Sequence, residues 1–172
     1  MQEEVHFIKK FFLNPQSIGS VMPSSRFLGK EIADLAGLLP DYKMIELGAG
    51  TGALTKYLCD YNPVIVEIDS NLCEMLKCNF ASQEIVNSCA IEYLKKVDFP
   101  CGIVISIPLI NNPAKDSIIM EIRRLYMAGI VKWCILYTYG FKNPLDEVGF
   151  KKGRRHKFVL RNVPPAHIWL YE

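Results

Sequence analysis

The sequence has no long hydrophobic run, no metal-ligand pattern and no marked excess of charge of either sign. Its 172 residues carry 20 Lys and Arg against 18 Asp and Glu, so the net charge is nearly balanced. The longest uncharged apolar run, residues 101–110, is too short to span a bilayer. The acidic start at Glu3 and Glu4 is unlike a secretory or transit peptide. We therefore expect one globular domain in the cytoplasm.

Cysteine is present but forms no motif. The 6 cysteines are scattered, and none forms a C-x-x-C pair or stands near a histidine at the spacing of metal ligands. No Ser-His-Asp or Cys-His arrangement indicates a nucleophilic hydrolase. We expect reduced thiols in a core and no metal site.

The most informative feature that the sequence does have is a glycine turn after an apolar strand. Glu46 lies in the strand, Gly48, Gly50 and Gly52 follow, and a helical pattern begins at once. Glycine accepts positive φ and lets a ligand approach the backbone closely. Between a strand and a helix, such a turn holds a nucleotide-like ligand.

Two nucleoside cofactors fit this turn. The order E-x-G-x-G-x-G resembles the first motif of class I methyltransferases that use S-adenosylmethionine (SAM). The same residues satisfy the looser dinucleotide fingerprint G-x-G-x-x-G/A. Glu67, at the end of the next strand, is placed to accept hydrogen bonds from both ribose hydroxyls of either cofactor. Glu46 stands where methyltransferases often carry an acidic residue near the methionine end of SAM, which favours SAM over NAD.

The order of elements predicts the fold. Strands are expected at 44–47, 64–68, 85–86, 103–107 and 131–138, with a closing antiparallel pair at 158–161 and 167–171. Helices are expected around 5–12 and at 24–37, 53–59, 71–79 and 116–127. This alternation predicts an α/β fold, the Rossmann-like seven-stranded class I methyltransferase sheet, parallel with an antiparallel edge hairpin, plus two N-terminal helices. We expect a single domain, in which 1–38 forms N-terminal helices or a lid and 39–172 forms the core.

Four segments together resemble bacterial phospholipid N-methyltransferases, a branch close to the rRNA adenine dimethyltransferases. They are residues 19–25, the glycine turn, residues 106–109, and residues 137–140 together with 161–169. The resemblance implies SAM as the cofactor. The cofactor-binding residues that it implies are Glu46, Gly48, Ala49, Gly50, Gly52, Glu67, Ile68, Cys89, Ala90 and Ser106. The substrate-binding residues are Ser24, Ser25, Pro108 and Leu109.

The chain departs from this pattern at two places. Cys89 stands where most relatives place an Asp that accepts a hydrogen bond from the adenine amino group, and a thiol is a poor acceptor. RNA dimethyltransferases carry N-[IL]-P-[YF] at the fourth strand, where the aromatic residue stacks on the flipped adenine. Here Ser106 and Leu109 occupy the first and last positions. Without that aromatic residue, adenine is disfavoured as the substrate.

Ser106 and Tyr139 are the expected catalytic residues. They would hold the acceptor amine together with nearby backbone carbonyls, and an aromatic face would attract a methylated ammonium. We expect Tyr137 and Tyr139 to face opposite ways, so that only one of them points at the site.

The expected function is SAM-dependent N-methylation of phosphatidylethanolamine or a related amine lipid. The alternatives are an RNA adenine N6-methyltransferase and a non-catalytic SAM-binding or membrane-binding module. The last quarter of the chain is basic, which suits the phosphates of RNA or of anionic lipid. The first helix could lie on a membrane as a peripheral anchor or cover the cofactor. An amine phospholipid is the expected partner, and RNA is less favoured.

Overall fold

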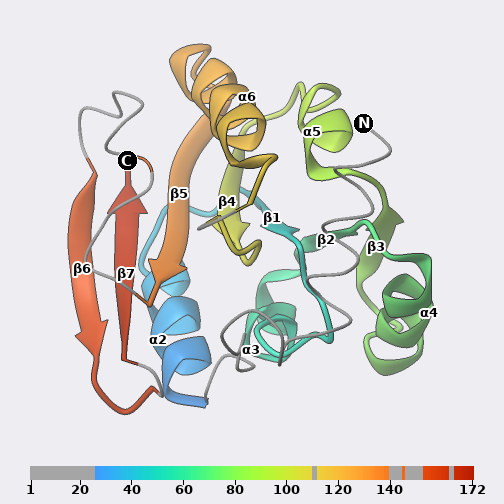
Figure 1. The fold of residues 1–172 in the computed structure, drawn as a ribbon, viewed down its shortest axis with the longest axis horizontal. Helices are drawn as coiled ribbons and strands as arrows, with labels where there is room; N and C mark the ends of the chain where they lie inside the picture. The colour runs from blue at the N-terminus through green and yellow to red at the C-terminus, as the bar shows by residue number, and fades with distance from the viewer. Residues whose placement is uncertain (1–25, 110–111, 140–144, 146–152, 163–164) are drawn as a thin grey trace.

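The protein forms one seven-stranded sheet (Figure 1). The computed structural model describes residues 26–109, 112–139, 145, 153–162 and 165–172. The strand order is β3-β2-β1-β4-β5-β7-β6. The first five strands are parallel, while β7 runs antiparallel to β5 and to β6. This confirms the predicted α/β sheet with an antiparallel edge.

The strands are short and the helices alternate with them along the chain. The strands are β1 Lys43–Leu47, β2 Val64–Glu67, β3 Glu84–Asn87, β4 Cys101–Ile105, β5 Val131–Thr138, β6 Arg154–Val159 and β7 Ala166–Tyr171. The helices are α2 Arg26–Gly37, α3 Thr55–Leu58, the 3-10 turn η1 Cys59–Tyr61, α4 Ser70–Asn79, α5 Ala90–Leu94 and α6 Lys115–Met127.

Helices cover both faces of the sheet. One cluster of buried side chains joins α5 and α6 to the face of β1 that carries Ile45 and Leu47. The other joins α2 and α3 to the face that carries Met44 and Val104. In Figure 1, α6 lies in front of β4 and β5, and α2 crosses behind β5. Strands covered on both faces are apolar throughout, which explains the unbroken hydrophobic runs of β2 and β4.

The strand order places a binding edge between β1 and β4. The chain runs outward from β1 to β2 and β3, then returns to β4 on the other side of β1. Ligands of open α/β sheets bind outside the carboxyl ends of the strands at such a reversal. Leu47 and Ile105 end the two strands there, and the Ser106 amide donates to the Leu47 carbonyl at 2.9 Å.

Some element boundaries differ from the sequence prediction. Strand β4 begins and ends two residues earlier than expected, because the surrounding run is uniformly apolar and contains no residue that marks its end. The helix after the glycine turn contains only Thr55–Leu58 before it tightens into η1. Helix α5 was not predicted. The expected first helix, around 5–12, lies outside the described residues.

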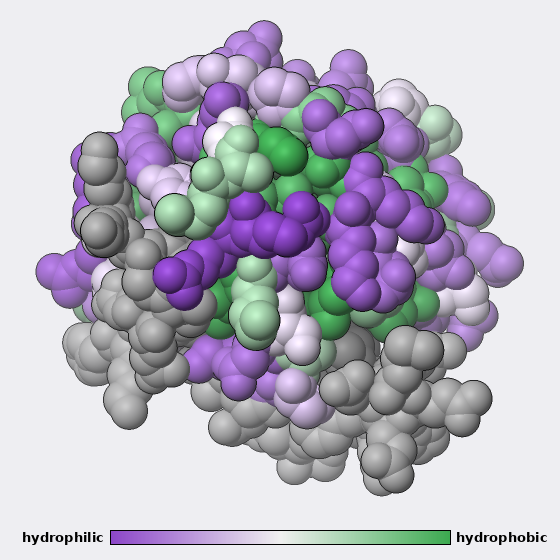
Figure 2. Space-filling view, turned by 90° about the horizontal axis from the view of Figure 1, so that it is seen from above, coloured by the Kyte–Doolittle hydropathy of each residue, from purple (hydrophilic) through white to green (hydrophobic). Residues whose placement is uncertain are grey.

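The described helices give no sign of a membrane span. None of them is both long enough and apolar enough to cross a bilayer. Hydrophilic residues dominate the face drawn in Figure 2, and hydrophobic residues emerge between them in smaller patches.

The packing of Gly102 against Trp133 yields a stability prediction. A Cβ at Gly102 in β4 would lie 2.0 Å from the Trp133 indole ring, which is buried and donates Nε1–H to the Pro40 carbonyl at 3.2 Å. We expect Gly102→Ala to lower the free energy of unfolding by about 1–3 kcal/mol through overpacking, as measured by urea denaturation. Gly129→Ala is the comparison, since a Cβ there meets nothing within 4 Å and only the positive φ of 70° opposes it. If Gly102→Ala lowered the free energy of unfolding by no more than Gly129→Ala does, overpacking against Trp133 would be contradicted.

Candidate nucleoside-binding site

The glycine turn has the backbone that the sequence predicts. Gly48, Gly50 and Gly52 have φ values of 75°, 58° and 80°, a region that side chains with a Cβ rarely adopt. The space beside the turn is also closed to larger residues. A Cβ on Gly48 would lie 2.3 Å from Cγ1 of Ile107, and one on Gly52 would lie 2.4 Å from the Phe80 ring. Glycine is therefore required for conformation and for close approach.

Glu67 ends β2 as a buried carboxylate held by backbone amides. Oε2 accepts from the Gly50 amide at 2.8 Å, and Oε1 accepts from the amides of Ile68 and Asp69 at 2.8 and 2.9 Å. These bonds tie the glycine turn to the end of β2. A carboxylate offers about four acceptor positions, so roughly one remains for a ligand, fewer than bonds to both ribose hydroxyls require.

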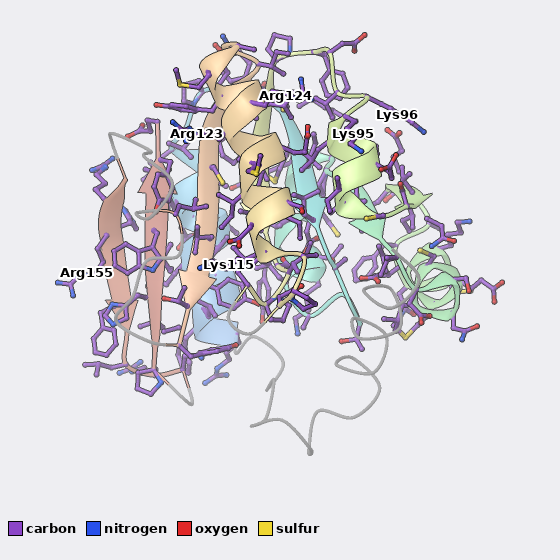
Figure 3. The ribbon with its side chains drawn as sticks, turned by 45° about the horizontal axis from the view of Figure 1, so that its top comes forward. Lys95, Lys96, Lys115, Arg123, Arg124 and Arg155 are labelled. Carbon is purple, nitrogen blue, oxygen red and sulfur yellow. The ribbon has the colours of Figure 1, made fainter. Side chains whose placement is uncertain are left out.

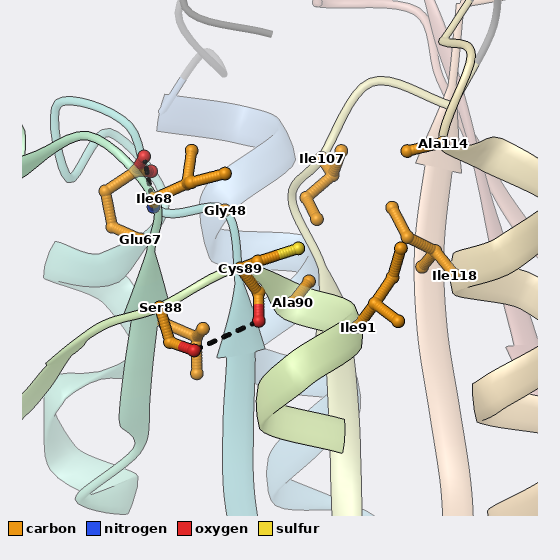
Figure 4. Close-up of a pocket in the computed structure, with 11 residues that line it drawn as sticks. Gly48, Glu67, Ile68, Ser88, Cys89, Ala90, Ile91, Ile107, Ala114 and Ile118 are labelled. Atoms are coloured by element: carbon orange, nitrogen blue, oxygen red, sulfur yellow. Dashed lines mark hydrogen bonds between the residues drawn. The ribbon is translucent and has the colours of Figure 1, made fainter. Parts of the chain in front are cut away.

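An apolar pocket lies beside Glu67, between the ends of the strands and helices α5 and α6 (Figure 4). Its polar edge is formed by Glu67 and Ser88, and the Cys89 thiol points into it. The apolar lining is formed by Val66, Ile68, Ala90, Ile91, Ile107, Ala114 and Ile118, and the backbone of Gly48 completes the wall. An apolar hollow with a carboxylate at its edge suits a nucleoside whose base packs against apolar side chains and whose ribose presents a hydroxyl to the carboxylate.

Sequence reasoning found only part of this pocket. It named Gly48, Glu67, Ile68, Cys89 and Ala90, all of which line the pocket. It did not assign Ile91 of α5 or Ile118 of α6 to the site. The apolar spacing of Ala90, Ile91 and Leu94 was the available signal, but five residues are too few for a clear helical period.

A second polar group lies at the ends of β1 and β4. Glu46 is fully buried, and its carboxylate accepts from the Thr55 hydroxyl at 2.8 Å and from the Ser106 hydroxyl at 2.9 Å. When Glu46 is ionised, both hydroxyls donate to it, and the remaining lone pairs of Ser106 are available to an incoming N–H group. The geometry brings together Glu46 and Ser106, which the sequence proposed separately, and adds Thr55, which it did not propose.

Burial raises the pKa of Glu46 from 4.5 to about 7. The hydrogen bonds from Thr55 and Ser106 lower it, and the charge of Glu67 raises it, but loss of solvation is the largest influence. The Glu46 carboxyl is therefore close to half protonated at neutral pH.

Two tyrosines at the end of β5, one in the strand and one just beyond it, contradict one expectation. Tyr137 and Tyr139 were expected to face opposite ways, but both pack against the cluster shared with α2 and α3. Their rings meet edge to face, with centroids 5.8 Å apart and planes at 71°. Residues two apart in a strand point to the same side, so the expectation misapplied the strand period. Tyr139 does not line the apolar pocket, which lies toward α5 and α6.

The other expected residues have varied positions. Ala49 is buried against Ile65 and Leu76 rather than lining the pocket. Leu109 is only 5% exposed and packs into the core beneath α6, so it fills the core and presents little surface to a substrate. Pro108 is half-buried. Ser24 and Ser25 lie outside the described residues. No cluster of potential metal ligands occurs in the part of the chain that the structure describes.

The raised pKa of Glu46 makes stability depend on pH. The unfolded chain loses this proton near pH 4.5 and the folded protein keeps it until about pH 7. Stability from this group is therefore complete below pH 4.5 and is lost as the pH rises toward 7. The loss amounts to about 3 kcal/mol at most. We expect Glu46→Gln to gain stability relative to the parent protein as pH rises from 5 to 8, as measured by urea unfolding. Parallel pH profiles would contradict this, and Glu92→Gln controls for removal of an exposed carboxylate.

Cys89 provides a test of the pocket. We expect Cys89→Asp to tighten SAM binding by about tenfold, because one added hydrogen bond contributes on the order of 1 kcal/mol. Calorimetric titration with SAM measures this, and unchanged or weaker affinity would contradict it. Cys89 is also the N-cap of α5 and makes no side-chain capping bond. Cys89→Ser is therefore the control, since Ser caps helices as Asp does. Equal tightening by both variants would indicate capping instead of a bond to adenine.

Sequence comparisons relate the N-terminal half of the chain to rRNA methyltransferases. Residues 15–96, just under half of the chain, match the family model for ribosomal RNA adenine dimethylase. Ribosomal RNA small subunit methyltransferase A from the Wolbachia of Brugia malayi is 43% identical over 76 residues, which cover 42% of this chain and 28% of the relative. The same protein from the Wolbachia of Culex pipiens is 32% identical over 111 residues, which cover 59% of this chain and 42% of the relative. The matches thus span less than half of either relative.

Structural comparison extends the likeness to most of the chain. The crystal structure of 23S rRNA methyltransferase ErmE superposes with a TM-score of 0.62 at 22% identity, covering 85% of this chain and 67% of that one. At this identity the likeness concerns the fold.

These comparisons correct the expected partner. An amine phospholipid was expected, with RNA less favoured and a peripheral membrane contact, but the relatives in sequence are rRNA methyltransferases. The preference for a phospholipid conflicts with them and is wrong. The chain has the class I fold of SAM-dependent methyltransferases, whose cofactor is SAM, and is related in sequence to the rRNA adenine dimethylases.

Proposed function

We propose that this protein transfers a methyl group from SAM to N6 of an adenine in RNA. The observation that carries the proposal is the match of residues 15–96 to the rRNA adenine dimethylase family. That segment includes the glycine turn, Glu67 and Cys89. It stops before Ser106, where the departures from the RNA enzymes begin. An RNA substrate fits the cytoplasmic location expected from the sequence.

In this proposal the nucleoside part of SAM occupies the apolar pocket. Glu67 binds a ribose hydroxyl, and Ile68, Cys89, Ala90 and Ile107 enclose the purine. The glycine turn, from Gly48 to Gly52, leaves room for the rest of the molecule. When bound, SAM supplies an electrophilic methyl group. The proposal keeps the division expected from the sequence, with residues 39–172 as the core and residues 1–38 as N-terminal helices or a lid.

Ser106 is the proposed acceptor for the adenine amine. Its hydroxyl proton is directed at Glu46, 2.9 Å away, so its oxygen accepts an N–H bond from the attacking nitrogen. This bond would orient the lone pair of the nitrogen for attack on the methyl carbon. The bond between that carbon and the sulfonium sulfur would break as the new bond forms, and the extra proton on the nitrogen would then leave to solvent. Glu46 acts through Ser106 and is a positioning residue.

Tyr139 is proposed to replace the missing aromatic residue. Leu109 occupies the aromatic position of the RNA enzymes but is buried in the core. Tyr139 is half-buried and lies with Tyr137 on the side of the sheet that carries α2 and α3. Base stacking on an aromatic ring contributes about 1–3 kcal/mol. Stacking on Tyr139 would hold a flipped adenine, a role that the aromatic residue aligned with Leu109 performs in the RNA enzymes.

The test gives the protein both possible substrates, RNA and lipid, in the same reaction. The protein is incubated with methyl-labelled SAM, total RNA and phosphatidylethanolamine liposomes, and the products are partitioned between organic and aqueous phases. We expect label in RNA, recovered as N6-methylated adenosine after nuclease digestion. Ser106→Ala should lower kcat about tenfold, because one hydrogen bond is lost. Tyr139→Ala should lower it more than Tyr139→Phe does, because Phe keeps the ring.

Three outcomes would count against the proposal. Label confined to the organic phase would exclude RNA as the substrate. SAM binding without transfer to either substrate would indicate a non-catalytic SAM-binding module. Unchanged rates in the Ser106 and Tyr139 variants would refute the assigned roles while leaving the reaction in place.

A further inference from the structure

A second hollow lies between α2 and α3, on the face of the sheet opposite α5 and α6. Its lining includes three cations, Arg26, Lys30 and Lys56, and three aromatic rings, Phe27, Tyr57 and Tyr61. We call it the α2–α3 groove. It is separate from the nucleoside pocket and shares no residue with it.

The two helices pack so that their first turns lie together. Gly29 of α2 lies directly against the Tyr57 ring, where a Cβ would approach to 2.3 Å. Further along, the Tyr61 hydroxyl donates to the Ala33 carbonyl at 3.0 Å. Residue numbers therefore rise in the same direction along both helices. Because α3 follows the glycine turn directly, the basic end of the groove lies toward the carboxyl edge of the sheet.

Three cations at this end lie over aromatic rings, and no carboxylate among the described residues forms a salt bridge with them. Arg26 lies 4.8 Å from the centre of the Phe27 ring, Arg161 lies 5.4 Å from the same ring, and Lys56 lies 5.0 Å from the Tyr57 ring. An aromatic ring attracts a cation without cancelling its charge. These groups therefore remain positively charged sites with donors for an anion.

Several basic side chains elsewhere are instead paired with carboxylates. Carboxylates lie within 3.1 Å of four of them, in the pairs Lys95–Glu92, Arg124–Glu121, Arg154–Glu172 and Lys157–Glu31. Figure 3 shows Lys95 and Arg124 on α5 and α6, away from α2, and Arg155 directed outward from the edge strand. The α2–α3 groove also contains Asp34 and Asp60, one turn further along each helix. Within the described residues, no salt bridge joins them to the groove cations.

We propose that the α2–α3 groove binds the phosphate backbone of the RNA strand next to the methylated adenine. The inference rests on the proposed function and adds a binding site to it. Phosphate contacts by Arg and Lys fix the position of a nucleic acid without reading its sequence. Phe27 and Tyr57 pack against the same cluster as Tyr137 and Tyr139, so the groove lies on the proposed acceptor side of the sheet.

The test is the salt dependence of RNA binding by the full chain. The probe is a fluorescein-labelled oligoadenylate of about ten nucleotides, followed by anisotropy. The test variant carries Arg26→Gln, Lys30→Gln and Lys56→Gln. The matched control carries Lys95→Gln, Lys96→Gln and Arg123→Gln, which remove the same charge from α5, its C-terminal flank and α6.

We expect the groove variant to bind at least tenfold more weakly at 0.1 M salt. The slope of log Kd against log salt should fall by about 2, because each lost contact with a single strand removes about 0.7. The control should stay within about twofold of the parent protein. SAM affinity should be unchanged in both variants, because none of these residues lines the nucleoside pocket. If the triple variant fails to fold, Lys30→Gln and Lys56→Gln alone should each lower the slope by about 0.7.

The outcomes separate this inference from the proposed function. If the parent protein methylates RNA but the groove variant binds the probe as tightly as the control does, the groove is not the phosphate site and the function stands. If the parent protein neither binds nor methylates RNA, both proposals fail. If the groove variant instead loses sedimentation with phosphatidylglycerol–phosphatidylcholine vesicles while keeping RNA affinity, the groove is a membrane site and the inference is overturned.

Discussion

The site depends on two buried carboxylates that form no salt bridge with any cation among the described residues. Glu46 is the penultimate residue of β1 and Glu67 the last residue of the neighbouring β2, and each is at most 1% exposed. A buried charge is costly unless hydrogen bonds replace its hydration. For Glu67, three backbone amides do so, and they simultaneously fix the glycine turn against β2. For Glu46, two hydroxyls do so incompletely, and its pKa rises to about 7. One carboxylate thus organises the backbone, and the other orients a side chain at the proposed reaction centre.

The proposed cofactor pocket and the proposed acceptor side lie on opposite faces of the sheet. The apolar pocket lies toward α5 and α6, where Ile91 and Ile118 form part of its wall. Thr55 of α3, and Tyr137 and Tyr139 at the end of β5, lie on the side of the sheet covered by α2 and α3. In the proposed reaction, a nucleoside on one side and an acceptor on the other would meet at the carboxyl ends of β1 and β4. The proposed assignment of Ser106 follows from this arrangement, because it lies one residue beyond β4 and bonds to the end of β1.

The sequence was most informative where function depends on neighbouring residues. The three glycines and Glu67 are recognisable because local spacing alone determines the turn and the strand end. The contact between Ser106 and Glu46 joins residues 60 positions apart, and no local pattern reveals it. Helix α5 escaped prediction because it is shorter than two helical turns. The orientation of Tyr137 and Tyr139, by contrast, could have been predicted from the sequence. The two-residue period of a strand places both side chains on the same face. The substrate class was misjudged because Leu109 was taken as the stacking position, whereas the chain buries it in the core.

The two tryptophans lie on opposite faces of the sheet. Trp133 belongs to the cluster under α2, and Trp169 packs against the cluster under α6 and donates Nε1–H to the Thr138 hydroxyl at 3.0 Å. Since the chain contains only these 2 tryptophans, replacing either with Phe leaves a fluorophore that reports on a single face. Emission from Trp133 would then follow the layer that holds the α2–α3 groove, and emission from Trp169 would follow the layer that holds the nucleoside pocket. The fold thus carries its own pair of spectroscopic probes, one for each half of the proposed reaction.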